Sequence, residues 1–593
     1  MSNYCKDIFD FIKQQEAAYR LPIRINDSWD WSMRDHIQTS ENYANSQLNT
    51  GKDDYTPVKN ITRPNLNLQH WTEDVDEKDA QIYINDDGKF HLSLLVKKYH
   101  DDVFVKENDL DTYFDELKNS RIDLGAGLSK KLNKARPECV PLQDIVFCNQ
   151  RDLLGGPLGI IHEYSPSELY EMEKKGWGDE ANGATHTIEQ LVTLWHEEEK
   201  PSEGIKIYEI FGTLPVRFRD PEAPENAYEE QMFICAFYQT KGNAEKQGVI
   251  LYAKQKDNYF KLIKRDAVHG RALGFGGAEE LFEAQVWTNY DMIRMQKMLD
   301  AAAVTILKSS DPTVIARHPQ GLKNMKNLEI IDAGPANDLS QVDTFPRNMR
   351  LFETSVANWE QHAKELSGAQ DPLQGVAPTA GTPFKSYDAQ IQQGMGLHKE
   401  RRKQFARHIE EIYNDWIIPH IKKEITNGYK FLSELSMEEM QFVTDRMAIH
   451  AWNSFFVDKV LSGGDFAEGE KEAWMEQWKT DFKKKGNKHF IEVLAKELKD
   501  APLKVSVAAS SSNLGEAADK ITKIFQFMFA NPQGFAQVMQ IPGMAVSFNK
   551  LLEFSGMSPA DFSDIEKMAI AQPQTPTAQP SPLQLPAQAP VNG

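Results

Sequence analysis

The sequence predicts an α+β protein that is predominantly helical after residue 277. Between Ile205 and Arg265, short runs rich in β-branched and aromatic residues alternate with turn residues, a spacing typical of an antiparallel meander. After Gly277, apolar residues recur at helical spacing over several long stretches. The 593 residues are 40% hydrophobic and 26% charged, the balance of an ordinary globular protein, so a sizeable core is expected.

Composition and charge exclude several classes of protein. The formal net charge is −20, so the chain lacks the surplus Lys and Arg that a protein coating nucleic acid needs. Its cysteines are far apart and form no CxxC pair, which excludes a cysteine zinc cluster and argues against a secreted disulfide scaffold; they are Cys5, Cys139, Cys148 and Cys235. No signal-peptide pattern and no apolar window of about 18 residues is present. We therefore expect a soluble protein made in the cytosol, with no membrane partner.

The region before residue 277 predicts both helices and strands. An apolar stripe at Ile8, Phe9, Ile12 and Ala17 predicts an N-terminal helix. A hairpin is expected over Gln81–Val96 because Asp87-Gly88 is a strong tight-turn signal between two apolar runs. Further helices are predicted over Glu107–Leu117 and from Ser165, where a capping hydroxyl precedes Pro166.

The region after residue 277 predicts three long helices with one interruption. The first helix covers Ala278–Ala303, the second covers Arg347–Leu366, and two short strands lie between them at Val304–Leu307 and Leu328–Ile331. A segment rich in Gly, Pro, Ala and Thr then leads to the third helix, which Pro419 should bend or end. The remaining expected elements are helices at Ser436–Leu461, Glu468–Asp481, His489–Leu498 and Asn513–Ala530, and a strand at Leu503–Ala508. Residues 571–593 are rich in Pro and Gln without a stripe, so they are predicted to be disordered.

No motif in the chain predicts catalysis. The glycines of His269–Gly277 lead into a helix, but Glu279-Glu280 would repel a phosphate there, so a tight chain reversal is the better interpretation. His196-Glu197 begins like a zinc-protease motif, yet Lys200 stands where the second histidine belongs. We therefore expect no catalytic residues, no cofactor and no metal site, and predict that the protein is not an enzyme.

Two basic clusters stand out against the acidic background. One comprises Lys399, Arg401, Arg402, Lys403 and Arg407, and the other Lys483, Lys484, Lys485 and Lys488. Each could contact nucleic acid or an acidic neighbour, but a solvated face or salt bridges between subunits explain them better. The aromatic stripes that include Trp359, Trp416 and Trp474 are expected to pack in the core or at a subunit interface.

From Gly270 onward the expected order is a glycine turn, a long helix, a small β insertion, a second helix, a flexible loop and a long bent helix. This order resembles that of the portal protein of tailed double-stranded-DNA bacteriophages. Three stretches carry the likeness: residues 270–302 (GRALGFGGAEELFEAQVWTNYDMIRMQKMLDAA) around Gln285 and Asn289, residues 358–393, and residues 413–421 (YNDWIIPHI). Upstream, residues 140–152 and 160–172 resemble the wing region of larger portals. The likeness covers roughly Asn60 to Asn427 and is firmest from Gly270 to Pro419, although the long Ser436–Pro502 segment departs from the simplest members.

The resemblance implies a subunit with wing, stem, clip and crown regions that forms a ring, usually of twelve copies, around a central channel. Its parts would be an N-terminal region and α/β wing (1–277), a first stem helix (278–303), a clip (304–346), a second stem helix (347–366), a tunnel loop (367–385), a long wing helix with further helical wing segment (386–512), a helical crown (513–570) and the disordered tail (571–593).

The resemblance also assigns residues to these parts. The tunnel loop facing DNA would include Ser367, Gly368, Gln370, Gln374, Gly375, Thr379, Gly381, Thr382 and Lys385. Docking of the terminase motor and the adaptor would use clip residues Thr305, Leu307, Lys308, Arg317, Lys323, Lys326, Glu329 and Ile331. Packing within the stem would use Leu281, Trp287, Tyr290, Phe352, Val356 and Trp359.

The implied function is a passive conduit for packaging and ejection of double-stranded DNA at one capsid vertex of the virion, after assembly in the host cytoplasm. Implied partners are further copies of the chain, duplex DNA without sequence specificity, the terminase large subunit, the major capsid protein with a possible scaffold protein, and head-completion or tail adaptor proteins. Two alternatives stay open: another structural virion protein, such as a minor head or adaptor protein, and a soluble enzyme with an α/β core and helical cap.

Overall fold

The computed structural model describes most of the chain up to residue 507. The described residues are 3–47, 57–76, 80–84, 90–131, 137–197, 204–220, 222–224, 226–238, 247–255, 259–303, 307–308, 340–341, 349–369, 373, 391, 393–427, 437–465, 469–499, 501, 503–507, 522, 523, 526 and 530. They fall into two compact units, which are described separately below. Unit 1 comprises Met1–Glu77 and Glu107–Ile417, and unit 2 comprises Lys78–Lys106 and Ile418–Gly593.

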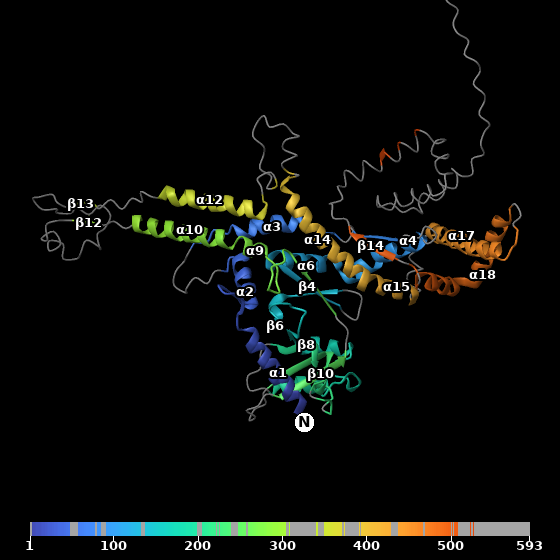
Figure 1. Ribbon diagram of the computed structural model, residues 1–593, viewed down its shortest axis with the longest axis horizontal. Helices are drawn as coiled ribbons and strands as arrows, with labels where there is room; N and C mark the ends of the chain where they lie inside the picture. Colours follow the sequence, from blue (N-terminus) through green and yellow to red (C-terminus); the bar gives the residue numbers. More distant parts are fainter. Residues whose placement is uncertain are drawn as a thin grey trace, which may run out of the picture. The chain divides into compact units, whose positions relative to one another are not determined.

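The largest sheet of unit 1 is antiparallel, with the strand order β10-β9-β8-β7-β6. Its strands are β6 (Ile145–Phe147), β7 (Leu158–Tyr164), β8 (Ile205–Pro215), β9 (Tyr228–Tyr238) and β10 (Gln247–Gln255). Helix α1 (Asn3–Tyr19) packs on β6 and β10 and buries Ile8 and Ile12 in the main core (Figure 1). The predicted N-terminal helix and the β8–β10 meander are therefore confirmed.

The last strand of the predicted meander belongs to a different sheet. Strand β11 (Phe260–Lys264) pairs with β4 (Ala126–Lys131), which in turn pairs with β5 (Pro137–Val140). Helix α6 (Leu110–Leu124) packs on this sheet, and α2 (Met33–Ala44), α3 (Thr62–Thr72) and the short α9 (Gly277–Glu280) pack against α6. The remaining small elements of unit 1 are β1 (Ile23–Asn26), β2 (Trp29–Trp31), α7 (Pro166–Glu173) and α8 (Ile188–His196). Ser165 caps α7 in a reciprocal capping box with Glu168, as the Ser-Pro pattern predicts.

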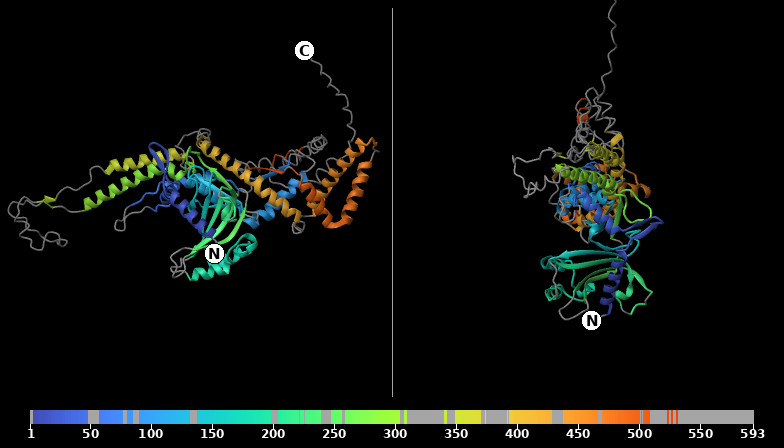
Figure 2. Two further views of the ribbon diagram at one scale, coloured as in Figure 1. Left: turned by 60° about the horizontal axis from the view of Figure 1, so that its bottom comes forward. Right: turned by 90° about the vertical axis from the view of Figure 1, so that its left-hand side faces the viewer.

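Two long helices of unit 1 form a hairpin, which we call the stem hairpin. Helix α10 (Phe282–Ala303) and helix α12 (Met349–Ser367) pack side by side, and β12 (Leu307–Lys308) pairs with β13 (Ser340–Gln341) beyond their far ends (Figures 1 and 2). The predicted helix over Ala278–Ala303 is divided at Leu281, where the short α9 ends and the chain turns into α10. Of the two strands expected between the helices, Leu328–Ile331 lies outside the described residues.

The third predicted helix continues past Pro419. Helix α14 (Gly396–Ile412) runs into a π-helical segment (Tyr413–Ile417), and α15 (Ile418–Asn427) follows. Pro419 is the second residue of α15 and directly follows the π-helical segment. The alternative that Pro419 ends the helix is therefore wrong, and the alternative that it bends the helix stays a prediction.

Unit 2 corrects the predicted hairpin. Residues 80–84 form strand β3 (Ala80–Ile84), but Phe90–Tyr99 is helix α4, because its apolar residues include Leu92, Leu95 and Val96 at helical spacing and all are buried. Strand β3 pairs instead with β14 (Leu503–Val507), the predicted lone strand. The other elements are α5 (Val105–Asn108), which crosses the unit boundary, α17 (Met437–Leu461) and α18 (Glu470–Lys499). Helix α18 is continuous where two helices were predicted.

No helix among the described residues is both long enough and apolar enough to cross a membrane.

Candidate subunit-contact site: the stem hairpin and the charged junction at its base

The two stem helices pack through small and aromatic residues. Val356 and Ala363 of α12 are buried, and the Trp359 ring stacks on Trp287 of α10 with centroids 6.3 Å apart and planes 8° from parallel. The Ser355 hydroxyl donates to the Asp291 carboxylate at 2.5 Å, which adds a polar link between the helices. The two helices of the stem hairpin are therefore packed against one another. The apolar stripe of the second helix predicts such packing.

Gln285 fixes the beginning of α10 to the chain before α3. Its Oε1 accepts from the backbone N–H groups of Ile61 (2.8 Å) and Thr62 (3.1 Å) and from the Thr62 hydroxyl (3.0 Å). Its Nε2 donates to the Lys59 carbonyl (2.8 Å) and to the Asn289 side chain (2.9 Å). Because Gln285 is buried, these bonds satisfy groups that would otherwise be costly to bury. The residue that the sequence likeness singled out is thus the polar anchor of the stem.

The glycine turn before α9 is a tight chain reversal, as predicted. A Cβ on Gly276 would lie 2.7 Å from the Gly125 backbone nitrogen, and one on Gly274 would lie 2.6 Å from the Gly125 carbonyl oxygen. Only glycine allows this close approach of the two backbones. The carboxylates that follow the turn are paired, since Glu279 accepts from Arg271 at 2.7 Å and Glu280 accepts from Arg265 at 3.1 Å.

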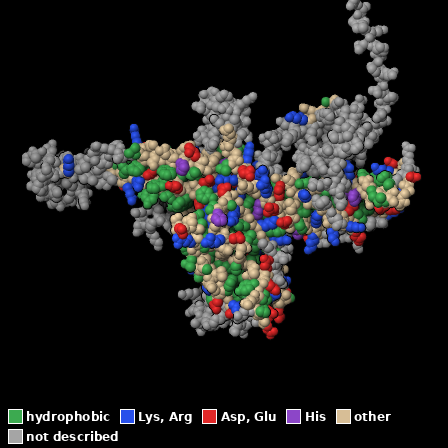
Figure 3. All heavy atoms as spheres, in the orientation of Figure 1, with side chains coloured by type: hydrophobic (Ala, Val, Ile, Leu, Met, Phe, Trp, Pro, Cys, Tyr) green, Lys and Arg blue, Asp and Glu red, His purple; other side chains and the backbone are tan. Residues whose placement is uncertain are grey.

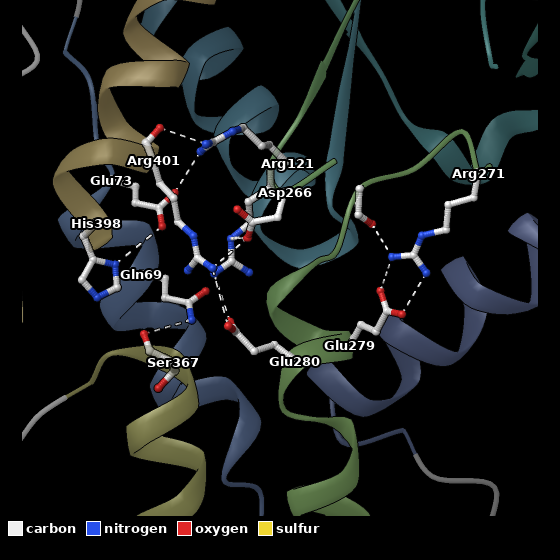
Figure 4. Close-up of polar contacts among 12 residues, drawn as sticks. Gln69, Glu73, Arg121, Asp266, Arg271, Glu279, Glu280, Ser367, His398 and Arg401 are labelled. Atoms are coloured by element: carbon white, nitrogen blue, oxygen red, sulfur yellow. Dashed lines mark hydrogen bonds and ion pairs between the residues drawn. The ribbon is translucent and has the colours of Figure 1, made fainter. Parts of the chain in front are cut away.

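A network of buried charges, which we call the charged junction, lies where α3, α6, α9, α12 and α14 meet (Figure 4). At its centre the fully buried Glu73 accepts from Arg121 at 2.9 Å, and the His398 ring lies 3.6 Å from the other carboxylate oxygen. Arg401 reaches Asp266 at 2.8 Å and Glu280 at 3.5 Å. Such a network is strongly destabilised if one partner is removed, because an uncompensated charge stays buried.

The electrostatics keep Glu73 ionised. Burial alone would raise the pKa of the Glu73 carboxyl, but neighbouring His398 and the charges of Arg265, Arg121 and Arg401 together hold that pKa below its ordinary value. Burial lowers the pKa of Arg121, and the adjacent Glu73 opposes this shift. The junction is therefore a set of mutually neutralised charges.

The junction also holds both flanks of the predicted tunnel loop. At the end of α12, the Ser367 carbonyl accepts from Gln69 at 3.5 Å, and the Ser367 hydroxyl donates to Asn65 at 3.2 Å. Gly368 has a φ of +68°, and a Cβ there would lie 3.0 Å from His398 Nε2 of α14. The residues that precede and follow the loop segment thus meet at one place on α3.

The structure brings together some of the predicted site residues. Leu281 and Val356 are buried, and Phe352 and Trp359 are partly buried. Ser367 is buried, and Lys308 is exposed in β12 next to Leu307. The other predicted loop and clip residues lie outside the described residues: Gln370, Gln374, Gly375, Thr379, Gly381, Thr382 and Lys385, and Thr305, Arg317, Lys323, Lys326, Glu329 and Ile331.

Two of the predicted stem-packing residues leave much of their surface exposed. Trp287 is 42% exposed and Tyr290 is 54% exposed, although α10 and α12 contact one another along their length. Hydrophobic side chains gather over the stem hairpin in the space-filling view (Figure 3). The exposed large hydrophobic residues of the two stem helices lie on more than one side of the hairpin; together they are called the stem face and are Phe282, Trp287, Tyr290, Leu299, Leu351 and Leu366. An apolar helix surface that its partner does not cover indicates a contact with another molecule.

Sequence reasoning missed the charged junction. Its members Glu73, Arg121, Arg265 and His398 are widely separated in the chain, and no local spacing connects them. Arg401 belongs to the predicted basic cluster, for which a solvated face was one interpretation; that interpretation is wrong for Arg401, which is buried and paired within the chain. Among the described residues, no group of three or more His, Cys, Asp or Glu side chains is arranged to hold a metal ion.

No protein-family model matches the chain, and no curated protein matches it. A chain of the structure titled "Virion of native gene transfer agent (GTA) particle" is 11% identical, with a TM-score of 0.26 over 78% of this chain and 98% of that chain. A chain of "Neck of empty GTA particle computed with C6 symmetry" is also 11% identical, with a TM-score of 0.27 over 76% of this chain and 98% of that one. TM-scores of this size carry no argument about fold or function.

Proposed function

We propose that the protein is a portal-type subunit of a phage-like particle, which assembles into a ring and lines a channel for double-stranded DNA at one vertex. The observation that carries the proposal is the stem hairpin with its uncovered apolar face. A lone hairpin can bury only the facing sides of its two helices, whereas α10 is apolar on further sides through Trp287, Tyr290 and Leu299. Neighbouring copies in a ring would cover this surface.

The sequence supports the same proposal independently of the stem face. The glycine turn, stem helix, strand-bearing connection, second helix, small-residue segment and long helix follow one another in the order found in portal proteins. The polar anchor at Gln285 and the glycine reversal give the beginning of the stem a fixed direction. A ring built from such subunits needs this rigidity, because small errors in stem direction accumulate around the circle.

The proposed mechanism is passive and involves no catalytic step. The clip would dock the terminase motor during packaging and an adaptor afterwards, and the wing would contact the capsid. The net charge of −20 suits a channel through which DNA slides, since dense pairing with phosphates would arrest it. The small-residue segment after Gly368 would contact the moving DNA, and the charged junction would hold its flanks in place.

Mass photometry and negative-stain imaging of the purified full chain test the proposal. We expect particles with a mass near twelve subunits and a central hole. A monodisperse monomer or dimer at micromolar concentration, across low and physiological salt, contradicts the proposal and favours the alternative of a soluble enzyme. Rings without a through-channel favour a different structural particle protein.

A further inference from the structure

One side of helix α14 carries a row of basic side chains, which we call the α14 stripe. It comprises Lys399, Lys403 and Arg407, which are exposed and spaced four residues apart, so the row spans about 12 Å. The opposite side of α14 is fixed in the protein, because Phe405 and Ile409 are fully buried. Glu400 is exposed beside this row and Glu411 ends it four residues after Arg407, so the row carries three positive charges with two carboxylates at its edge.

A second surface of unit 1 has the complementary charge. A cavity of about 570 Å³ is bordered by α2, α6, β5 and the turn at Leu142–Asp144. Five carboxylates line it: Glu41, Glu116, Asp123, Glu138 and Asp144. Asp123 already pairs with His70 at 2.7 Å and with Arg63 at 3.8 Å, and Gln143 donates to Glu41. No Lys or Arg is among the described residues that line the cavity.

The carboxylates of this cavity repel one another in the isolated chain. Burial raises the pKa of Glu41, and the charges of Asp123 and Asp144 raise it further. Burial also raises the pKa of Asp144, while His162 opposes the shift. Cations brought in from outside would relieve this repulsion.

The two charged surfaces lie on opposite sides of α6. Arg121 points from α6 toward α14 and donates to the Arg401 carbonyl at 2.9 Å. The α6 residues that line the cavity are Glu116, Asn119, Ser120 and Asp123. At about 100° per residue, each of them lies about 100° or more around the helix from Arg121. Figure 1 shows the same arrangement, with α2 on one side of α6 and α14 on the other. A single copy therefore cannot bring its own stripe into its own cavity.

We infer that the α14 stripe of one copy docks against the acidic cavity of a second copy, in a head-to-tail contact that repeats around the proposed ring. This inference rests on the proposed ring assembly and names a polar contact within it. Different surfaces on opposite sides of a subunit make a heterologous interface, the kind that closes into rings. Exposed ion pairs add little affinity each, so the stem face would provide most of the affinity and the charges would set orientation and register.

Charge reversal with mixing tests this contact. One chain carries Lys403→Glu and Arg407→Glu in the stripe, and the other carries Glu41→Lys and Glu116→Lys in the cavity. We expect each chain alone to lose at least about tenfold of its ring fraction at low salt by mass photometry. An equimolar mixture should recover the rings. When the two chains alternate around the ring, each reversed, acidic stripe meets a reversed, basic cavity, and each native stripe meets a native cavity. A control chain with Lys483→Glu and Lys484→Glu, on exposed positions of α18, has the same change in net charge as the stripe variant and should form rings normally.

Each outcome has a defined meaning. Circular dichroism and thermal unfolding first establish that the variants fold. Normal rings from both reversed chains, or no recovery in the mixture, overturn the inference while leaving the ring proposal intact. Failure of the unsubstituted chain to form rings overturns both.

Discussion

At the scale of single residues, Gln285 shows how one side chain can determine the direction of a helix. Its side chain forms hydrogen bonds with the backbone of three residues that lie close together in the chain, Lys59, Ile61 and Thr62. The sequence likeness pointed to this residue, but its partners more than 200 positions away could not be predicted from local spacing. The glycine reversal was predictable, because several glycines before a helix require a tight turn.

We predict that Gln285→Leu destabilises the stem base by about 2–4 kcal/mol, since it leaves the buried backbone N–H groups of Ile61 and Thr62 without partners. Hydrogen exchange followed by mass spectrometry should show faster exchange in the peptide containing Ile61 and Thr62. The matched control is Gln296→Leu on the same helix, where the native amide makes an exposed bond to Asp300. If the peptide containing Ile61 and Thr62 exchanges at the same rate in both variants, this result would falsify the role of Gln285 as the anchor of the stem.

A buried carboxylate in unit 1 predicts a dependence of stability on pH. Burial would raise the pKa of Glu209, but Lys130 and His162 lower it from 4.5 to about 2. The folded state therefore binds this proton more weakly than the unfolded chain does. The resulting stabilisation is complete above about pH 4.5 and is lost as the pH falls from there toward 2.

Urea unfolding of unit 1 between pH 2 and 6 measures this dependence. We expect the acid limb to be shallower in Glu209→Gln than in the unsubstituted chain, although the variant is less stable throughout because Lys130 stays buried. Glu229→Gln, which removes a half-exposed partner of Arg219, should keep the original slope. A slope unchanged by Glu209→Gln would rule out this carboxylate as a source of acid sensitivity.

At the scale of elements, substitutions in the stem face are expected to weaken the assembly of subunits without unfolding the subunit. We predict that Tyr290→Ser with Leu299→Ser lowers the ring fraction at least about tenfold while the folded chain stays intact. These side chains are half exposed in the isolated subunit, so their removal costs little folding free energy but much buried area between copies. Mass photometry gives the ring fraction. Tyr170→Ser, at a similarly exposed aromatic residue of α7, is the control and should assemble normally. Unimpaired rings from the stem variant would place the subunit contact elsewhere.

The pairing of β3 with β14 is a second element-scale feature, confined to unit 2. Val505 of β14 is buried opposite Ile82, whereas its neighbour Ser506 is exposed. We predict that Val505→Asp destabilises unit 2 by about 3 kcal/mol or more, because it buries an unpaired charge, while Ser506→Asp changes stability by about 0.5 kcal/mol or less. Limited proteolysis should cut the first variant faster within unit 2. Identical digestion of the two variants would contradict the pairing.

Elements that depend on local signals were predictable, and elements that depend on distant partners were not. The Ser165 cap, the β8–β10 meander and the stem helices all follow from turn residues and apolar spacing. The hairpin expected near Asp87-Gly88 was wrong, because a short, mostly apolar run such as Phe90–Val96 suits a buried helix as well as a strand. The partner of β3 lies about 420 residues away, beyond the reach of any local signal.

At the scale of the whole molecule, we propose that copies of this chain close into a ring around a channel, with the stem face between neighbours. A three-dimensional reconstruction of the purified assembly by cryo-electron microscopy tests it most directly. We predict a closed ring in which Trp287 and Tyr290 of each copy are covered by the next copy, and in which the channel is wide enough for duplex DNA. A closed assembly whose stem faces point to solvent, or a particle without a continuous channel, would contradict the account.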